Sequence, residues 1–183
     1  MEKRLLDSSK EYATPFTVEA LVNRRKGYVG KELNERRYFK RTGQVFHQRK
    51  VKRGLIELLD HLDELGMRRC VATSSSRSFA KKALTIVGVL ERVDFVITAE
   101  DVSKGKPNPD IYLAAAKKLS VDIGNMLVLE DSPTGTKAGV SAGAYVVSVP
   151  NEHTKQGCFD GCRWIANSLL DERIYGLLKG CAN

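Results

Sequence analysis

The sequence predicts an α/β protein built on a parallel sheet with helices on both faces. From residue 54 onward, short apolar segments of strand length alternate with segments of helical periodicity, and this alternation with short connections is typical of a parallel sheet. Hydrophobic residues make up 42% of the 183 residues and charged residues 28%. That balance supplies a core and excludes a disordered chain.

The sequence contains no segment that predicts membrane crossing or export. The longest apolar runs, Met126–Leu129 and Ala144–Val147, have the length of strands and not of a membrane-spanning helix. At the amino terminus, Glu2 and Asp7 bracket an apolar patch that is too short for a secretory signal. We therefore expect a soluble, cytoplasmic protein with no membrane partner.

The net charge of +8 is concentrated in the first 53 residues. Residues 1–53 contain 15 Lys+Arg and 6 Asp+Glu, a net +9, whereas residues 54–183 contain 15 and 16, a net −1. A basic segment can bind nucleic acid, but no recognition motif accompanies this one. A solvated helical face, or one that closes over an anionic substrate, explains the charge better. Nucleic acid is therefore not an expected partner.

The predicted core begins with an amphipathic helix. Apolar residues recur at helical spacing from Leu55 to Leu65, and Gly66 supplies a cap at the carboxyl end. The strands predicted after it are Arg69–Thr73, Phe95–Thr98, Met126–Leu129 and Tyr145–Val149, and the helices are Ser78–Val87, Asp110–Leu119, Pro133–Ser141 and Ser168–Leu178. In open parallel sheets ligands bind beyond the carboxyl ends of the strands. The residues that follow each strand are therefore the candidate site residues.

The first predicted strand ends in the run Thr73-Ser74-Ser75-Ser76. Hydroxyls and free backbone N–H groups between a strand and a helix can bind an anion. Runs of serine and threonine also commonly cap helices, and the run by itself does not decide between the two roles. Thr73 and Ser74 are the candidate anion-binding residues.

A lysine follows the second predicted strand in a stiffened loop. Pro107 and Pro109 restrict the backbone and deny helical geometry to the residues before them, so Lys106 is held just before a helix that begins near Asp110. A lysine fixed beside a phosphate can neutralise the charge that develops in phosphoryl transfer. The alternative is a solvated loop lysine, and the Lys-Pro-x-Pro-Asp arrangement favours the functional interpretation.

The third predicted strand ends in two adjacent carboxylates, Glu130 and Asp131. Such a pair repels itself unless a cation intervenes, and Mg²⁺ prefers oxygen ligands while it retains several waters. Alternatively, Asp131 or Ser132 caps the next helix, with Pro133 at its first position. Both interpretations hold together if one residue caps and another binds metal. We predict a magnesium site at Glu130 and Asp131.

Taken in order, these segments resemble a known family. VATSSS, SKGKPNPDIYLAAAKKL and VLEDSPTGTKAGVSAG resemble motifs two, three and four of the haloacid dehalogenase superfamily, in the branch of β-phosphoglucomutase and related sugar-phosphate phosphatases. The resemblance runs from Gly54 to Val149 and extends loosely backward into the basic segment. It implies a partial helical cap over residues 1–53 and a Rossmann-like α/β core over residues 54–183.

The resemblance also implies a chemistry for the candidate residues. Thr73, with Ser74 and the adjoining backbone, would bind the transferring phosphoryl group. Lys106 would pair with that group, and Asp131, supported by Glu130, would hold Mg²⁺. The implied activity is that of a phosphatase or phosphomutase, and the implied substrate is a small phosphorylated metabolite such as a sugar phosphate.

The family's nucleophile motif is not found in the sequence. The family carries Asp-x-Asp-Gly-Thr/Val on its first strand, but the 183 residues contain no Asp-x-Asp, and Asp60 and Asp63 are three residues apart in a helical pattern. Without the nucleophile no aspartyl-phosphate forms, so we expect this chain to be inactive alone. We also expect the first strand to be missing from the sheet, which would leave a gap through which the chain self-associates.

Three explanations of the missing motif stay open. The sequence is a truncated form of a complete hydrolase, a degenerate protein that binds phosphate without catalysis, or a chain completed by another one. We favour the first explanation, because the remaining motifs have the form expected of a functional enzyme. A receiver-type signalling domain is the alternative from another class. In that scheme, however, the lysine stands on the last strand, whereas here Lys106 precedes Asp131.

Overall fold

A computed structural model describes residues 16–18 and 52–180 of the chain. Its strands are β1 (Phe16–Val18), β2 (Arg69–Ala72), β3 (Phe95–Ile97), β4 (Leu127–Glu130), β5 (Tyr145–Ser148) and β6 (Trp164–Ile165). Its helices are α2 (Leu55–Glu64), α3 (Arg77–Ile86), α4 (Asp110–Leu119), α5 (Pro133–Ala142) and α6 (Glu172–Gly180), with short 3₁₀ helices η1 (Leu90–Arg92), η2 (Ala99–Asp101) and η3 (Ile123–Asn125). The helices and strands expected after residue 54 are confirmed, and their ends differ from the predicted ones by at most four residues.

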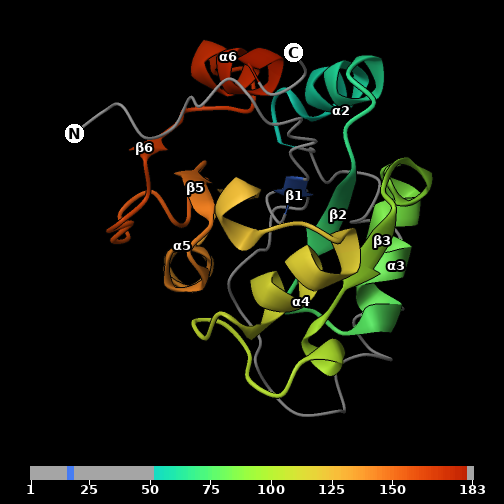
Figure 1. Cartoon of the computed structure of the whole chain (residues 1–183), viewed down its shortest axis with the longest axis vertical. Helices are drawn as coiled ribbons and strands as arrows, with labels where there is room; N and C mark the ends of the chain where they lie inside the picture. Colours follow the sequence, from blue (N-terminus) through green and yellow to red (C-terminus); the bar gives the residue numbers. More distant parts are fainter. Residues whose placement is uncertain (1–15, 19–51, 181–183) are drawn as a thin grey trace.

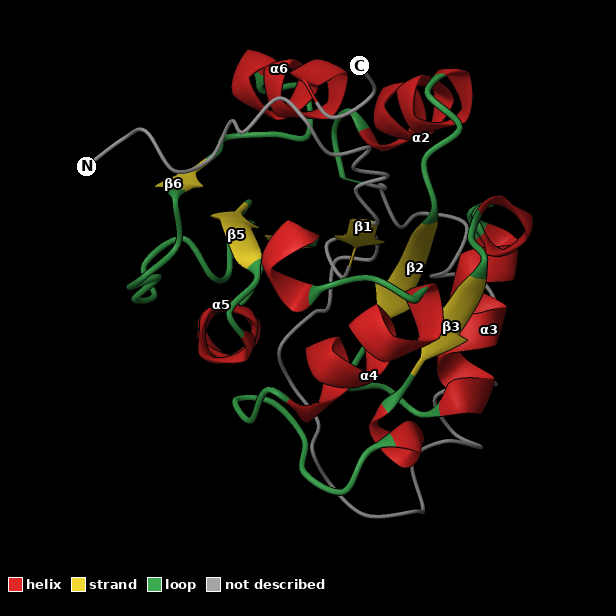
Figure 2. Cartoon of the chain, viewed as in Figure 1, coloured by secondary structure: helices red, strands yellow, loops and turns green. Residues whose placement is uncertain are grey.

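The strands form one parallel sheet in the order β3-β2-β1-β4-β5-β6 (Figure 1). Between β2 and β5, each strand is followed by a helix and then by the next strand (Figure 2). All carboxyl ends therefore meet at one edge of the sheet, which is the edge where open α/β folds bind ligands.

Side chains of the central strands alternate between two apolar clusters, one on each face of the sheet. In β4, Leu127 and Leu129 belong to one cluster and Val128 belongs to the other. This alternation follows from the pleat, which points successive side chains to opposite faces. Because both faces are covered, β2 and β4 are buried along their whole length, as their nearly unbroken apolar sequence predicts.

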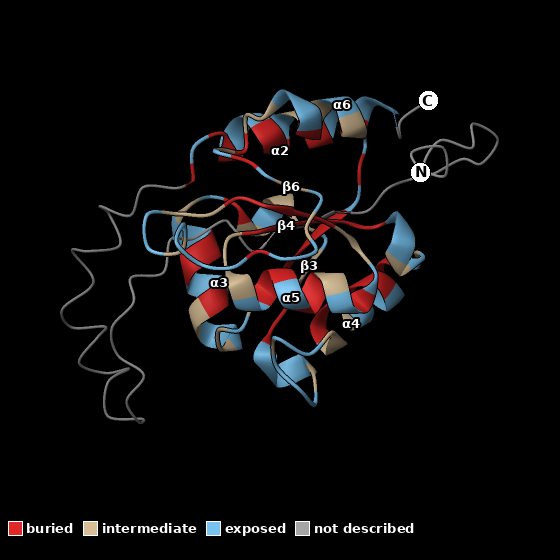
Figure 3. Cartoon of the chain, turned by 90° about the vertical axis from the view of Figure 1, so that its left-hand side faces the viewer, coloured by how far each residue is buried: buried red, intermediate tan, exposed pale blue. Residues whose placement is uncertain are grey.

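Helices α2 and α6 cover one face of the sheet, and α4 and α5 lie on the opposite side (Figure 3). The inner face of α2 is made of leucines at helical spacing, all at most 1% exposed: Leu55, Leu58, Leu59 and Leu62. After α2, Gly66 adopts a left-handed φ of 61°, a conformation that glycine reaches without strain. The predicted helix and its glycine cap are confirmed.

The position that was expected to be an empty gap is occupied. Strand β1 pairs in parallel with β2 and with β4, so the facing edges of these two strands have a backbone partner. The prediction of a missing strand was therefore wrong in its structural consequence, and self-association through a sheet gap loses its basis. Residues 16–18 come from the segment that was assigned to the cap, so at least this part of it lies in the core sheet.

The predicted helical cap cannot be followed further, because residues 1–15 and 19–51 lie outside the described residues. A partial cap over residues 1–53 therefore stays a prediction. In the described part of the chain, every helix is too short or too polar to span a membrane.

Candidate active site

The carboxyl edge of the sheet brings together three segments that are far apart in sequence. Thr73 follows β2, Lys106 lies in the loop between β3 and α4, and Asp131 follows β4. Lys106 Nζ lies 3.3 Å from the carbonyl oxygen of Ala72, the residue before Thr73, and 2.7 Å from Oε1 of Glu130, the residue before Asp131. The lysine therefore bridges the ends of β2 and β4.

Lys106 is held by a buried network. Its side chain is 2% exposed, that of Glu130 is fully buried, and the two form an ion pair. Tyr112 of α4 accepts a hydrogen bond from Lys106 Nζ at 2.8 Å and donates one to Glu130 Oε1 at 2.7 Å. Burial lowers the pKa of Lys106, while the charge and hydrogen bond of Glu130 oppose this shift. Burial also raises the pKa of Glu130, but Lys106 and the surrounding donors outweigh it, so the net direction is downward. Each group thus favours the charged form of the other across the ion pair.

Glu130 is occupied by protein donors on both oxygens. Oε1 accepts from Lys106 and Tyr112, and Oε2 accepts from the backbone N–H and the hydroxyl of Ser132, each at 3.0 Å. A carboxylate has about four acceptor positions, and these four hydrogen bonds fill them. Glu130 therefore fixes the ammonium of Lys106. A role of Glu130 in holding Mg²⁺ stays a prediction.

Asp131 stands beside this pair in a different environment. Its Oδ2 accepts a hydrogen bond from Asn151 Nδ2 at 3.0 Å. Burial and the nearby charge of Glu130 raise its pKa, and Lys52, Asn151 and Lys106 partly offset the rise. A carboxylate that is disfavoured by burial and by a second carboxylate gains stability from a cation.

Capping of α5 is carried out by Ser132. Its Oγ accepts from the N–H of Gly135 at 3.0 Å, and Pro133 occupies the first helical turn. The alternative that left capping to Asp131 or Ser132 is thus resolved in favour of Ser132. Asp131 has no capping role and is available for another.

The run after β2 forms a tight turn. Thr73 continues the ladder by donating its N–H to the carbonyl of Ile97, and its Oγ1 accepts from the N–H of Ser75 at 3.1 Å. Thr73 is half-buried and Ser74 is exposed. Ser76 precedes α3 without a side-chain capping bond, so the capping interpretation of this run is not supported.

An ion-pair cluster ties the start of α3 to the end of β3. The N–H of Arg77 donates to Glu100, and its guanidinium donates to Asp101 Oδ1 at 2.6 Å. Asp101 also accepts from the backbone and side chain of Thr98 at 2.8 Å. Slight burial raises the pKa of Asp101, but these hydrogen bonds outweigh it and hold the pKa below its usual value. The cluster fixes the turn that carries Thr73.

Lys52 also lies at this edge, although it is not among the candidate residues that the motifs indicate. The residue is 7% exposed, and its Nζ donates to the carbonyl oxygen of Val149, just after β5. In the sequence Lys52 is one of several basic residues before Gly54, and nothing in that pattern distinguishes it from solvated neighbours. Only the tertiary structure places its ammonium at the carboxyl end of β5.

The described residues fit a magnesium ion that is held by few protein ligands. They contain no cluster of three or more His, Cys, Asp or Glu side chains that could enclose a metal. Mg²⁺, however, is commonly bound by one or two carboxylates together with waters and substrate phosphate oxygens. Asp131, with its raised pKa and its position at the sheet edge, suits such a site.

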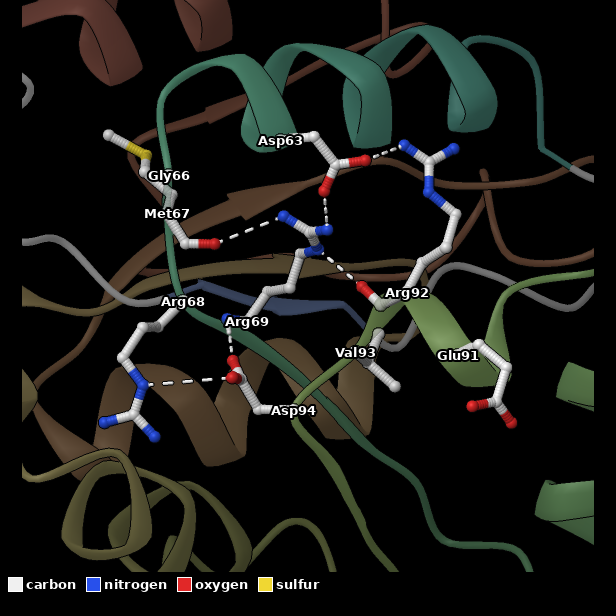
Figure 4. A pocket seen from close by; sticks show the side chains of 9 residues that line it. All are labelled: Asp63, Gly66, Met67, Arg68, Arg69, Glu91, Arg92, Val93 and Asp94. Atoms are coloured by element: carbon white, nitrogen blue, oxygen red, sulfur yellow. Dashed lines mark hydrogen bonds and ion pairs between the residues drawn. The ribbon is translucent and has the colours of Figure 1, made fainter.

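A separate pocket of about 320 Å³ lies at the opposite, amino-terminal edge of the sheet (Figure 4). Its arginines are paired. Arg69 and Arg92 both contact Asp63, and Arg68 lies 3.9 Å from Asp94. The side chain of Arg69 also donates to the carbonyl oxygen of Arg92 at 2.6 Å, and its backbone N–H donates to Asp94 Oδ2 at 2.7 Å. These contacts connect α2, β2 and η1, so the pocket has a structural explanation.

The fold and the site are those of an α/β protein that gathers a lysine, a hydroxyl and an aspartate at the carboxyl edge of its sheet. This combination is typical of phosphoryl-transfer enzymes. The family model for haloacid dehalogenase-like hydrolases matches residues 5–143. The chain belongs to this family, and the recognition made from the sequence motifs is confirmed.

Two curated relatives illustrate the similarity. Validoxylamine A 7'-phosphate phosphatase from Streptomyces hygroscopicus subsp. limoneus is 40% identical over 100 residues, which cover 55% of this chain and 47% of the relative. Hexitol phosphatase A from Escherichia coli (strain K12) is 38% identical over 96 residues, which cover 52% of this chain and 44% of the relative. The chain spans about half the length of these relatives.

Solved structures show the same fold. A β-phosphoglucomutase-like protein from Thermotoga maritima has a TM-score of 0.69 at 25% identity, covering 82% of this chain and 71% of that one. A HAD family hydrolase from Deinococcus radiodurans R1, with bound phosphate and sodium, has a TM-score of 0.71 at 18% identity, covering 94% and 97%. At that identity the second similarity concerns the fold alone.

Proposed function

We propose that the chain belongs to a magnesium-dependent hydrolase, of phosphatase or phosphomutase type, that acts on a small phosphorylated metabolite such as a sugar phosphate. The observation that carries the proposal is the position of Lys106, whose buried ammonium is fixed by Glu130 between the ends of β2 and β4. The names of two relatives that match this region, validoxylamine A 7'-phosphate phosphatase and hexitol phosphatase A, support a small phosphorylated metabolite as the substrate class.

The residues of this chain would divide the work as follows. Thr73 and Ser74, with the turn that carries them, bind the phosphoryl oxygens. Lys106 neutralises charge on the same group, and Glu130 holds Lys106 in place. Asp131 holds Mg²⁺, which when bound supplies further neutralisation of the phosphoryl oxygens.

Phosphoryl transfer itself needs a nucleophile that these residues do not include. The family chemistry uses an Asp-x-Asp pair, and the 183 residues contain none. Loss of such a nucleophile leaves binding while it removes orders of magnitude of rate. We therefore propose that this chain by itself binds magnesium and phosphate without turnover. Its action in the cytoplasm stays a prediction.

The test is to measure binding and turnover with the same purified chain. Inorganic phosphate should bind in the presence of Mg²⁺, as followed by calorimetry, and p-nitrophenyl phosphate should not be hydrolysed above background. Lys106→Met and Asp131→Asn should each weaken phosphate binding, whereas Lys104→Met, at an exposed lysine of the same loop, should not. Hydrolysis that Asp131→Asn abolishes would contradict the inactive state, and absence of phosphate binding would overturn the proposed function.

A further inference from the structure

Lys52 is a buried lysine to which the proposed function assigns no role. It lies just before α2, and its Nζ donates to the carbonyl oxygen of Val149. The N–H of Val149 in turn donates to the carbonyl oxygen of Glu130. Asn151, two residues after Val149, donates to Asp131. The ammonium of Lys52 is therefore placed where β4 and β5 end, at the edge that also carries Asp131, the carboxylate that we assign to magnesium.

The electrostatics of Lys52 and Asp131 are linked. Burial lowers the pKa of Lys52, and the charges of Asp131 and Glu130 oppose this shift. Conversely, Lys52 is the first of the influences that counter the raised pKa of Asp131. A buried ammonium is costly unless a carboxylate compensates it. Glu130 is already paired with Lys106, which leaves Asp131 as the neighbouring carboxylate that can balance the charge of Lys52 through space.

The charges at the edge then balance. Counted at their usual charges, the two lysines Lys52 and Lys106 and the two carboxylates Glu130 and Asp131 cancel. These four groups together carry no net charge before a ligand binds. One divalent cation makes the edge doubly positive, which matches the charge of a phosphate dianion.

We propose that Lys52 is a positioning residue that acts as the built-in counter-charge of Asp131, so that it weakens Mg²⁺ binding and strengthens phosphate binding at the same site. The inference rests on the proposed function of this edge. Removing the positive charge of Lys52 leaves the edge with a net charge of −1. Metal affinity and phosphate affinity then change in opposite directions. A lysine with a purely structural role would alter both affinities in the same direction, or neither.

Lys52→Gln is the suitable variant, because the glutamine amide can still donate to the carbonyl of Val149 while the charge is lost. Titration calorimetry would measure binding of Mg²⁺ alone and then of inorganic phosphate at saturating Mg²⁺. We expect Lys52→Gln to bind Mg²⁺ roughly tenfold more tightly and phosphate roughly tenfold more weakly, the scale of one charge removed from a partly buried site. Lys52→Arg should retain both affinities.

The matched control is Arg53→Gln, which removes one positive charge from the next, exposed residue and should leave both affinities unchanged. Thermal melting of each variant verifies folding, and Lys52→Met provides a second uncharged variant if Lys52→Gln fails to fold. Affinities that fall together, or that do not change, would overturn the role of Lys52. If wild type and Lys52→Gln both fail to bind Mg²⁺, the proposed function fails as well, and this outcome differs from failure of the Lys52 proposal alone.

Discussion

Replacing Lys106 by methionine should destabilise the protein more than any other substitution of a lysine in the described residues. Methionine keeps the length of the apolar stem and removes the ammonium. Glu130 would then be a fully buried carboxylate that retains its three hydrogen bonds from Tyr112 and Ser132 but has lost its cation. A buried charge that loses its partner carries its full desolvation cost.

The magnitude follows from the geometry. At the observed separation of 2.7 Å, two unit charges attract by about 6 kcal/mol at an effective dielectric constant of about 20. Part of this is offset because the variant no longer desolvates the ammonium. Removal of one partner from a buried pair typically costs about 3–5 kcal/mol. We expect the free energy of unfolding to fall by about that amount, a large part of the roughly 5–15 kcal/mol of an ordinary domain.

Urea unfolding at neutral pH, followed by circular dichroism, measures this loss, with Lys104→Met as the control for an exposed lysine of the same loop. The double variant Lys106→Met/Glu130→Leu should recover most of the stability, because it removes both charges. In the single variant the isolated Glu130 has a raised pKa and binds a proton on acidification, so the deficit should shrink as the pH falls. A loss below about 1 kcal/mol, the range of exposed pairs, or a double variant no more stable than the single one, would refute the buried-pair argument.

Three further predictions concern other parts of the described structure. Gly135→Ala would place a methyl group on the buried carboxylate beneath α5 and should cost about 3 kcal/mol or more of unfolding free energy, whereas Gly176→Ala, in open space, should be neutral or stabilising by up to about 1 kcal/mol; equal effects would contradict the close approach. Burial raises the pKa of Cys70 to about 12, so at pH 8 iodoacetamide should label the exposed Cys158 and spare Cys70, as peptide mass spectrometry would show; labelling of both in the folded protein would count against it. The pKa of Asp101 is lowered in the folded protein, so its ionised carboxylate stabilises the fold above the ordinary pKa of the group, and this stabilisation is lost as the pH falls through the lowered value. Asp101→Asn should therefore be less stable than the wild type at pH 7 and should lose less stability on acidification. Stability–pH profiles that run parallel for the two proteins would exclude this linkage.

Local patterns were sufficient for the elements that follow residue 54. The leucines of α2 recur with the helical period and are all buried, and the apolar segments after them became β2 to β5. These predictions succeeded because a helical face or a buried strand is determined by near neighbours in the sequence. The family motifs also placed Lys106 and Asp131 at one edge of a parallel sheet, and the structure brings Lys106 to the residue before Asp131.

Sequence reasoning failed where a role depends on partners distant in the chain. Strand β1 has three residues, too few for a periodic pattern, and it exists through its pairing with β2 and β4. The hydrogen-bond network of Glu130 was not anticipated either: its four donors come from Lys106, Tyr112 and Ser132. Two of those donors lie 18 and 24 residues away, so spacing carries no signal for them.

The sequence alone determined the fold class, the order of the helices and strands after residue 54, and the family, because hydrophobic periodicity and short motifs are local properties. The tertiary structure decided that Glu130 is the carboxylate that holds Lys106, and it added Lys52 to the same edge. The physical reason is that ion pairing and desolvation depend on distances in space between side chains. Those distances exist only once the parallel strands have brought their carboxyl ends together.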